Sequence, residues 1–260
     1  MKVYDDSNYK DVLDYATKNQ FAMTCEPRDF AKVPRGSIAG APAATIKIPP
    51  RSDWSAMIKE RNEKGMLLSK LWLRNKTKVL SQGQTNYCWV NGVVSAMYAM
   101  RAANGLPFLE LSPASVAAQI KGFRNVGGWG TEALEWIIRN GINRASLWPC
   151  NAIDRKYLTA ESKADALTNR VTEWADIGPR NFDLQMAYAL ALKPLAVGYN
   201  WWRHEVCQLD PVEIEPGSFG ILIVNSWDVT WDDDGMAVLR EGKATADDAV
   251  CPEVMDAIAA

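Results

Sequence analysis

The stretch that decides the fold runs from Gln82 to Trp89 and reads Gln-Gly-Gln-Thr-Asn-Tyr-Cys-Trp. Far along the chain it is followed by the only histidine, His204, and then by an Asn-Ser-Trp that begins at Asn225. A thiol, an imidazole and a carboxamide in this order are the parts of a cysteine nucleophile, its base and the group that orients the base. The sequence therefore indicates a nucleophilic site made of Cys88, His204 and Asn225.

The residues around this cysteine suit acyl chemistry. We expect Cys88 in the first turn of a helix, where the positive end of the helix dipole favours a thiolate. Attack on a carbonyl carbon creates an oxyanion, which needs preorganised hydrogen-bond donors. Gln82, six residues earlier (88 − 82), can supply its side-chain amide beside the backbone N–H of Cys88. Asn225 can hold the imidazole of His204, and the indole of Trp227 can shield that contact from water.

Composition places the chain among ordinary globular proteins. Of its 260 residues, 48% are apolar and 23% are charged, and the net charge is −2. This balance indicates neither nucleic acid nor an anionic membrane as a partner, and apolar runs such as 221–224 are too short to span a bilayer. The first ten residues lack the apolar core of a secretory signal. We expect a cytoplasmic or virion-associated protein of bacterial or phage origin.

The cysteines indicate a reducing compartment. There are five, an odd number, widely spaced and without a Cys-x-x-Cys pair, which argues against a disulfide framework and against a zinc site. The stretch 230–241 nearly fits a calcium loop, but Thr230 stands where the first aspartate ligand belongs. We therefore predict no metal and no cofactor.

The order of predicted elements indicates an α+β protein. Apolar spacing and helix-end signals predict helices at 9–16, within 53–78, at 88–103, from 112 onward, at 131–140 and at 184–192. Short apolar runs between Gly, Pro and Asp predict strands at 195–199, 205–209, 220–224 and 236–239. Helices followed by strands favour a helical half packed against a sheet or barrel half, with a cleft between them. The tail after residue 243 is expected to form a short helix.

These residues resemble those of the papain-like (C1-type) cysteine peptidases. In that family the histidine and asparagine follow the cysteine by about 130–150 residues, and here they follow it by 116 (204 − 88) and 137 (225 − 88). Residues 50–54 resemble the Pro-x-x-x-Asp-Trp of the mature amino terminus. Further matches in the same order are Leu111-Ser112, Gly127-Gly128, Ala133-Leu134, Gly141-Ile142, Trp148-Pro149, His204-Glu205-Val206 and Asn225-Ser226-Trp227, followed by Trp231, Gly235 and Arg240.

The resemblance spans about residues 48–242 and implies a two-lobed fold. It places a helical N-terminal lobe against an antiparallel, β-barrel-like C-terminal lobe. It also implies that Gly127 and Gly128 bind the backbone of an extended peptide substrate, with Trp89 and Trp227 beside them. The tryptophan pair 201–202 suits either the wall of the cleft or the core. Residues 1–50 are then an N-terminal extension, 51–242 the peptidase domain and 243–260 a tail.

Several positions depart from the family pattern. Thr85 and Val126 stand where the family has disulfide cysteines, in keeping with a reducing compartment. Tyr87, Arg203 and Asp228 replace a small residue, an aspartate and a glycine around the catalytic residues. The leader is short for an inhibitory propeptide and does not clearly match one, so the sequence does not predict self-activation.

The leading hypothesis is a thiol hydrolase that cleaves peptide or isopeptide bonds in a peptide or protein substrate. One alternative is a catalytically silent papain-fold protein that serves as a structural or binding component of a larger assembly such as a phage particle. In that case residues 1–50 would dock on neighbouring subunits. A third hypothesis is acyl transfer to an amine, which uses the same catalytic residues.

Overall fold

The computed structural model describes residues 1–31 and 46–255. Its helices are α1 (Lys10–Asn19), α2 (Arg51–Glu63), α3 (Leu68–Arg74), α4 (Cys88–Ala103), α5 (Pro113–Ile120), α6 (Gly130–Asn140), α7 (Ala160–Leu167), α8 (Phe182–Leu190) and α9 (Glu241–Ala244), with a 3-10 turn at Arg155–Tyr157. Its strands are β1 (Val3–Tyr4), β2 (Val171–Ile177), β3 (Leu195–Tyr199), β4 (His204–Glu215), β5 (Ser218–Val224), β6 (Met236–Arg240) and β7 (Asp248–Met255). None of the helices in these two described ranges is long and apolar enough to cross a lipid bilayer.

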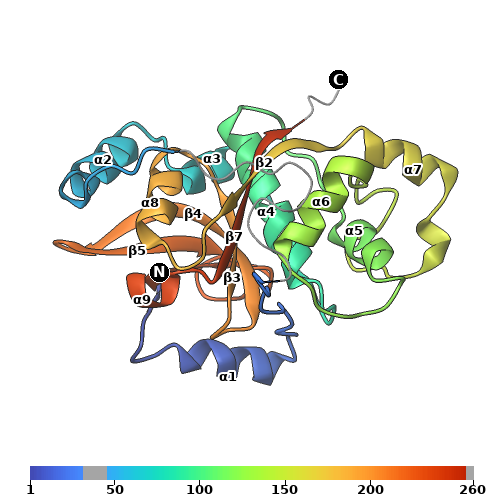
Figure 1. The fold of residues 1–260 in the computed structure, drawn as a ribbon, viewed down its shortest axis with the longest axis horizontal. Helices are drawn as coiled ribbons and strands as arrows, with labels where there is room; N and C mark the ends of the chain where they lie inside the picture. The colour runs from blue at the N-terminus through green and yellow to red at the C-terminus, as the bar shows by residue number, and fades with distance from the viewer. Residues whose placement is uncertain (32–45, 256–260) are drawn as a thin grey trace.

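Helix α4 forms the centre of the molecule, between the sheet and the helices α5 and α6 (Figure 1). Every residue from Cys88 to Ala102 is buried, so the helix contacts protein on all sides, as expected for a core helix, although it carries Asn91, Ser95 and Arg101. At Gly92 it touches β4 closely, because an added Cβ would lie 3.1 Å from Cγ of Glu205 and 3.3 Å from the carbonyl oxygen of Val206. This contact sets the start of α4 beside the start of β4.

The helix-end signals of the sequence act as predicted. The hydroxyl of Ser112 accepts a hydrogen bond from the backbone N–H of Ser115 and caps α5, with Pro113 in the first turn. Helix α6 ends at Gly141, whose φ of 72° lies in the left-handed region. A side chain at Gly141 would also overlap the carbonyl of Ala166. The helices predicted at 88–103, from 112 and at 131–140 are therefore confirmed.

The strands form one sheet in the order β1-β6-β5-β4-β3-β7-β2. All neighbouring pairs are antiparallel except β1 and β6, which are parallel. The predicted α+β class is confirmed, and so are the four predicted strands. The barrel-like closure is wrong for the described residues, because the edge strands β1 and β2 do not pair with each other. Two strands that the sequence did not predict, β1 and β2, form these edges.

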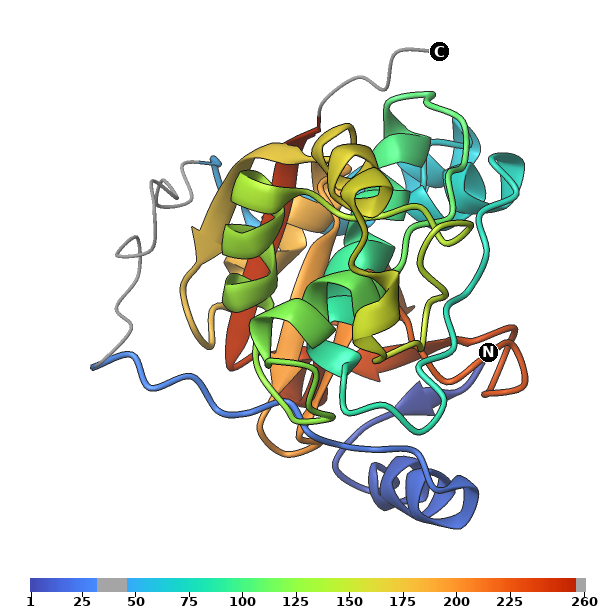
Figure 2. The ribbon, with the colours of Figure 1, turned by 90° about the vertical axis from the view of Figure 1, so that its right-hand side faces the viewer.

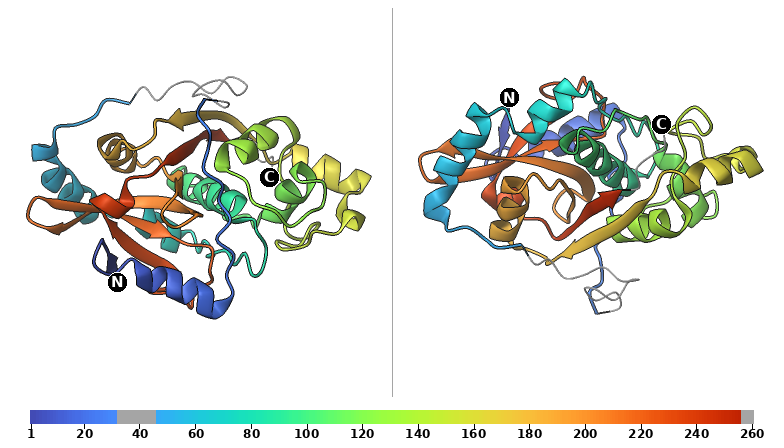
Figure 3. Two further views of the ribbon diagram at one scale, coloured as in Figure 1. Left: turned by 60° about the horizontal axis from the view of Figure 1, so that its bottom comes forward. Right: turned by 90° about the horizontal axis from the view of Figure 1, so that it is seen from above.

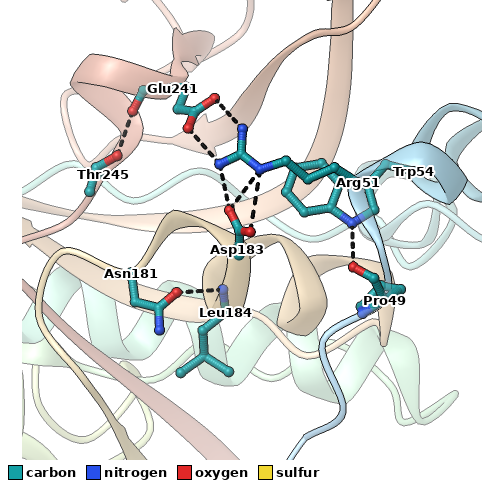
Figure 4. A network of polar contacts seen from close by, with 8 residues as sticks. All are labelled: Pro49, Arg51, Trp54, Asn181, Asp183, Leu184, Glu241 and Thr245. Atoms are coloured by element: carbon teal, nitrogen blue, oxygen red, sulfur yellow. Dashed lines mark hydrogen bonds and ion pairs between the residues drawn. The ribbon is translucent and has the colours of Figure 1, made fainter.

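The first turn of helix α2 binds to helices α8 and α9 (Figure 4). Arg51 reaches Asp183 of α8 and Glu241 of α9, with its Nη2 atom 2.8 Å from Oε1 of Glu241. Trp54 is fully buried and its indole nitrogen donates to the carbonyl of Pro49 at 3.1 Å. The exposed ion pairs contribute little, so burial of the indole is the main stabilising term here.

The expected short helix in the tail is wrong. Residues 248–255 form β7, which lies inside the sheet between β3 and β2 (Figure 1). Its pairing partners include Ala196, Val197 and Gly198 on one side and residues from Val171 to Ile177 on the other. The tail is a short apolar run without helical spacing, and only the two neighbouring strands make it a strand.

The position of β7 predicts that the C-terminus is needed for folding. A chain that ends at Ala246 would expose the edges of both β3 and β2 and lose buried apolar surface. We expect it to show no cooperative thermal transition by circular dichroism. The control is a chain that ends at Met255, which we expect to melt within a few degrees of the full chain. Similar melting of the two truncated chains would contradict the role of β7.

Candidate active site

Cys88 is fully buried at the start of α4. Burial is the largest influence on its thiol and raises the pKa to about 11, although hydrogen bonds from Thr24 and from the backbone of Glu205 oppose this shift. The contact with Glu205 places the sulfur next to β4, where His204 is the first residue. The packing of α4 on β4 at Gly92 therefore places Cys88 beside the backbone of Glu205, the residue that follows His204.

His204 and Asn225 are in direct contact. The imidazole Nε2 lies 2.8 Å from Oδ1 of Asn225, and both residues are fully buried. With Nε2 protonated and donating to the carboxamide, Nδ1 is the acceptor, and Nδ1 is buried without a hydrogen-bond partner among the described residues. Burial lowers the pKa of His204 to about 4, and the bond to Asn225 opposes the shift.

Two tryptophans shield this contact, as the sequence analysis expected of one of them. The ring centroids of Trp227 and Trp202 lie 4.7 Å and 5.0 Å from that of His204. Trp202 is therefore a core residue that covers the histidine. Of the two alternatives for Trp202, cleft wall or core, the structure shows the core. Asn225 is held from behind, since its backbone N–H donates to the carbonyl of Gly235 at 2.9 Å.

Gln82 is held beside the asparagine loop by a residue that the sequence analysis missed. The hydroxyl of Ser226 donates to Oε1 of Gln82 at 2.7 Å, and the backbone N–H of Gln82 donates to the carbonyl of Ser226 at 2.8 Å. These bonds engage the carbonyl oxygen of the side chain, so its amide nitrogen is left to donate to other groups. Its position in the Asn-Ser-Trp motif is the signal for Ser226 in the sequence.

The amide of Gln82 is occupied by the chain's own N-terminal segment. Its Nε2 donates to the carbonyl of Ala22 at 3.0 Å and to the carbonyl of Thr85 at 3.0 Å. The segment after α1 runs over the beginning of α4 in the left view of Figure 3 and in Figure 2. The ring of Phe21 stacks on Trp227 with the centroids 5.3 Å apart. A main-chain carbonyl thus lies on the donor that the sequence assigns to an oxyanion.

The same segment pairs with the Gly-Gly loop. The backbone N–H of Glu26 donates to the carbonyl of Gly128 at 3.0 Å, and Cys25 and Gly128 form an isolated parallel bridge. On the other side, the backbone N–H of Cys25 donates to the carbonyl of Arg203 at 2.9 Å. A Cβ at Gly127 would overlap the carbonyl of Thr24, so glycine permits this close approach. The Gly-Gly loop therefore pairs with the backbone of the chain's own Cys25 and Glu26.

The remaining wall residue, Trp89, packs directly under the Gly-Gly loop. A Cβ at Gly128 would lie 2.8 Å from the indole of Trp89, and Nζ of Lys121 lies 5.0 Å from the centre of that ring. The ammonium of Lys121 is also paired with Glu132 at 2.7 Å. Trp89 therefore packs against the Gly-Gly loop.

Hydrogen bonds connect the two loops that the family joins by a disulfide. Thr85 closes its own turn by donating to the carbonyl of Gln82 at 2.7 Å. The side chain of Asn125 accepts from the backbone N–H of Asn86 at 2.6 Å, and the side chain of Asn86 donates to the carbonyl of Asn125 at 2.7 Å. The hydroxyl of Tyr87 donates to the carbonyl of Arg124 at 2.9 Å. Tyr87 thus fastens the loops together and does not point at the histidine.

The covered site holds neutral partners. A thiol with a pKa of about 11 and an imidazole with a pKa of about 4 are both uncharged at pH 7. The cause is the same for both, since the segment 20–28 and the tryptophans exclude water from charged forms. Within the part of the chain that the structure describes, no three His, Cys, Asp or Glu side chains are grouped so that they could hold a metal.

Comparisons with known proteins agree with this geometry at the level of fold. No protein-family model matches the chain. Among solved structures, digestive procathepsin L 3 of Tenebrio molitor larval midgut matches 93% of this chain and 97% of its own, with 15% identity and a TM-score of 0.59. The bromelain protease from Ananas comosus matches 67% of this chain and 92% of its own, with 20% identity and a TM-score of 0.56. Xylellain, a cysteine protease from Xylella fastidiosa, matches 67% of this chain and 81% of its own, with 17% identity and a TM-score of 0.56.

This protein has the fold of the papain-like cysteine proteases. At these identities the similarity establishes the fold alone, and the chemistry must be argued from the side chains.

Because the chain has a single histidine, the protonation of His204 can be measured directly. Because its folded-state pKa lies below the usual 6.5, His204 contributes stability that is lost as the pH falls from 6.5 through about 4. We expect the imidazole NMR signal of the full chain to stay in the neutral form at pH 6 and to titrate near pH 4. A titration midpoint near 6.5 would mean that the ring is solvated. The variant His204→Gln should lose less stability over the same pH range.

Proposed function

We propose that this protein is a cysteine-type peptidase that hydrolyses peptide or isopeptide bonds. The observation that carries the proposal is the extended main chain lying along Cys88, with its Ala22 carbonyl on Gln82 and its Glu26 amide on Gly128. A groove that binds one peptide backbone through these atoms has the donors and acceptors to bind another. The fold of known cysteine proteases supports the same conclusion.

In the proposed mechanism the sulfur of Cys88 attacks the carbonyl carbon of the substrate. Nδ1 of His204 takes the thiol proton, while Asn225 holds Nε2 and keeps the ring in place. The oxyanion that forms is bound by Nε2 of Gln82 and by the backbone N–H of Cys88. The leaving amine takes the proton from His204, and a thioester remains on the sulfur. Water, deprotonated by His204, then releases the acid and restores the thiol.

The N-terminal segment must move before a substrate can bind. Gln82, Cys88, His204 and Asn225 are all fully buried in the covered state. We therefore propose that residues 20–28 keep the peptidase inactive until they are displaced, and the neutral thiol and imidazole support this. The described part of residues 1–50 packs on its own chain, with Val12 and Ala16 of α1 buried. Docking on neighbouring subunits through residues 1–50 stays a prediction.

Turnover of peptides should depend on Cys88 and His204. We expect Cys88→Ser and His204→Ala to lower kcat/KM on a fluorogenic peptide library by at least about a thousand-fold. The matched control is Cys150→Ser, at a partly exposed free cysteine outside the site, which should keep the wild-type rate. A full chain that turns over no peptide, even after its segment has been displaced, would favour the silent alternative.

Weakening the segment should expose the nucleophile. Arg28 anchors the segment through its buried ion pair with Asp176, so Arg28→Ala should raise the rate at which iodoacetamide labels Cys88 by about ten-fold or more. Arg74→Ala, at an exposed arginine of α3, should leave the rate unchanged. Equal labelling rates in the two variants would contradict the covering role. Mass spectrometry of the labelled peptides separates Cys88 from the other four thiols.

A further inference from the structure

A groove of about 640 Å³, the α3 groove, lies between α3 and the loop from residue 228 to residue 236. Its apolar lining includes Trp72 and Leu73 of α3 together with Val79, Val229 and Met236. Its volume falls in the range of clefts that bind ligands in proteins. None of the four residues proposed for catalysis lines it, so the α3 groove is distinct from the active site.

Large apolar side chains of the α3 groove are exposed to solvent. Leu73 is 68% exposed, Met1 60% and Val229 51%. In the ranges 1–31 and 46–255 seven large apolar side chains are exposed, and these three share one groove. Single exposed apolar residues are ordinary on a protein surface, whereas a group of them around one hollow is typical of a surface that another molecule covers.

Carboxylates form most of the polar rim of the α3 groove. Asp228 and Asp234 line it, and no cation of the described ranges forms an ion pair with either of them. Asp233 pairs with the N-terminal amino group at 3.5 Å, and the ammonium of Lys78 is paired with Glu110 at 2.9 Å. The rim therefore presents two carboxylates whose charge the described chain does not neutralise.

The loop that carries these acids is fixed by its own main chain. The backbone N–H of Asp228 donates to the carbonyl of Leu80 at 3.3 Å, and that of Gly235 donates to the carbonyl of Trp231 at 2.8 Å. The loop also packs on the groove lining, because a Cβ at Gly235 would lie 2.7 Å from Cγ1 of Val79. A groove that is already formed loses little conformational freedom when a partner binds.

A molecule that fits the α3 groove must bring apolar groups for its walls and positive charge for its rim. The acidic rim repels phosphates, so nucleic acid and anionic membrane surfaces are poor partners. A protein segment in which leucine-like residues alternate with lysines or arginines supplies both features. Its apolar side chains would cover Leu73 and Val229, and its cations would lie against Asp228 and Asp234.

We propose that the α3 groove is a docking surface for a basic and apolar segment of a partner protein. The groove is close to the active site along the chain, since Asp228 follows Asn225 by three residues (228 − 225). A docked partner is therefore held on the loop that follows the asparagine bonded to His204. The inference does not depend on peptidase activity, and it applies equally to a protein without catalysis.

The first test measures the binding of three fluorescently labelled peptides to the full-length chain by anisotropy. The chain carries Cys88→Ala so that no peptide is cleaved. The peptides have the same length and alternate leucine with lysine, leucine with glutamate, or serine with lysine. We expect the leucine–lysine peptide to bind at least about ten-fold more tightly than the other two, and less tightly as the salt concentration rises. Equal affinities would overturn the proposal.

Two double variants show where the leucine–lysine peptide binds. The apolar double variant is Leu73→Ser with Val229→Ser, and the acidic double variant is Asp228→Asn with Asp234→Asn. Asparagine tolerates the positive φ of 76° and 53° at these two aspartates. We expect each double variant to weaken binding by about five-fold or more. Unchanged binding in both would overturn the docking surface, whatever the outcome of the peptidase assays.

The matched controls lie elsewhere on the surface. They are Leu167→Ser, at a leucine of α7 that is also exposed, and Asp14→Asn, at an exposed aspartate of α1. Both should change the affinity by less than about two-fold, and a loss as large as that of the double variants would contradict the proposal. Binding to phosphatidylcholine vesicles that is as tight as peptide binding, and that is lost in the apolar double variant, would identify a lipid surface as the partner and overturn the proposal. Because Leu73 and Val229 are exposed, the apolar double variant should melt within a few degrees of the parent chain.

Discussion

The packing of α4 against β4 at Gly92 is the contact on which the site depends. With no side chain at this position, the helix comes close enough to Glu205 for the backbone there to bond the sulfur of Cys88. The next residue back is His204, and its ring is fixed by Asn225 from β5's end. Any larger residue at Gly92 would push the helix away from the strand and disturb the contact of Cys88 with the backbone of Glu205.

One segment of the chain covers this site. Residues 20–28 put a carbonyl on Gln82, a backbone bridge on Gly128 and a guanidinium on Asp176. By excluding water, the same segment keeps the thiol and the imidazole uncharged. Any other chain that binds at these atoms must first displace the contacts of residues 20–28.

The sequence predicted the local elements well where a single segment carried the signal. The buried helix that begins at Cys88, the cap at Ser112 and the strand 195–199 all follow from spacing within one stretch. It did not predict β7, since residues 248–255 are a strand only through β3 and β2. It also missed Ser226 and the Asn86–Asn125 bonds, because each contact joins residues far apart in the chain.

By itself the sequence determined the candidate chemistry. The order of a glutamine, a cysteine, a histidine and an asparagine is typical of a nucleophilic thiol with its base. In this chain these residues are Gln82, Cys88, His204 and Asn225. Only the tertiary structure decided that residues 22–28 lie against Gln82, the Gly-Gly loop and Asp176. The physical reason is that strand register and long-range packing set which distant side chains meet, and neither is encoded in any one stretch of the chain.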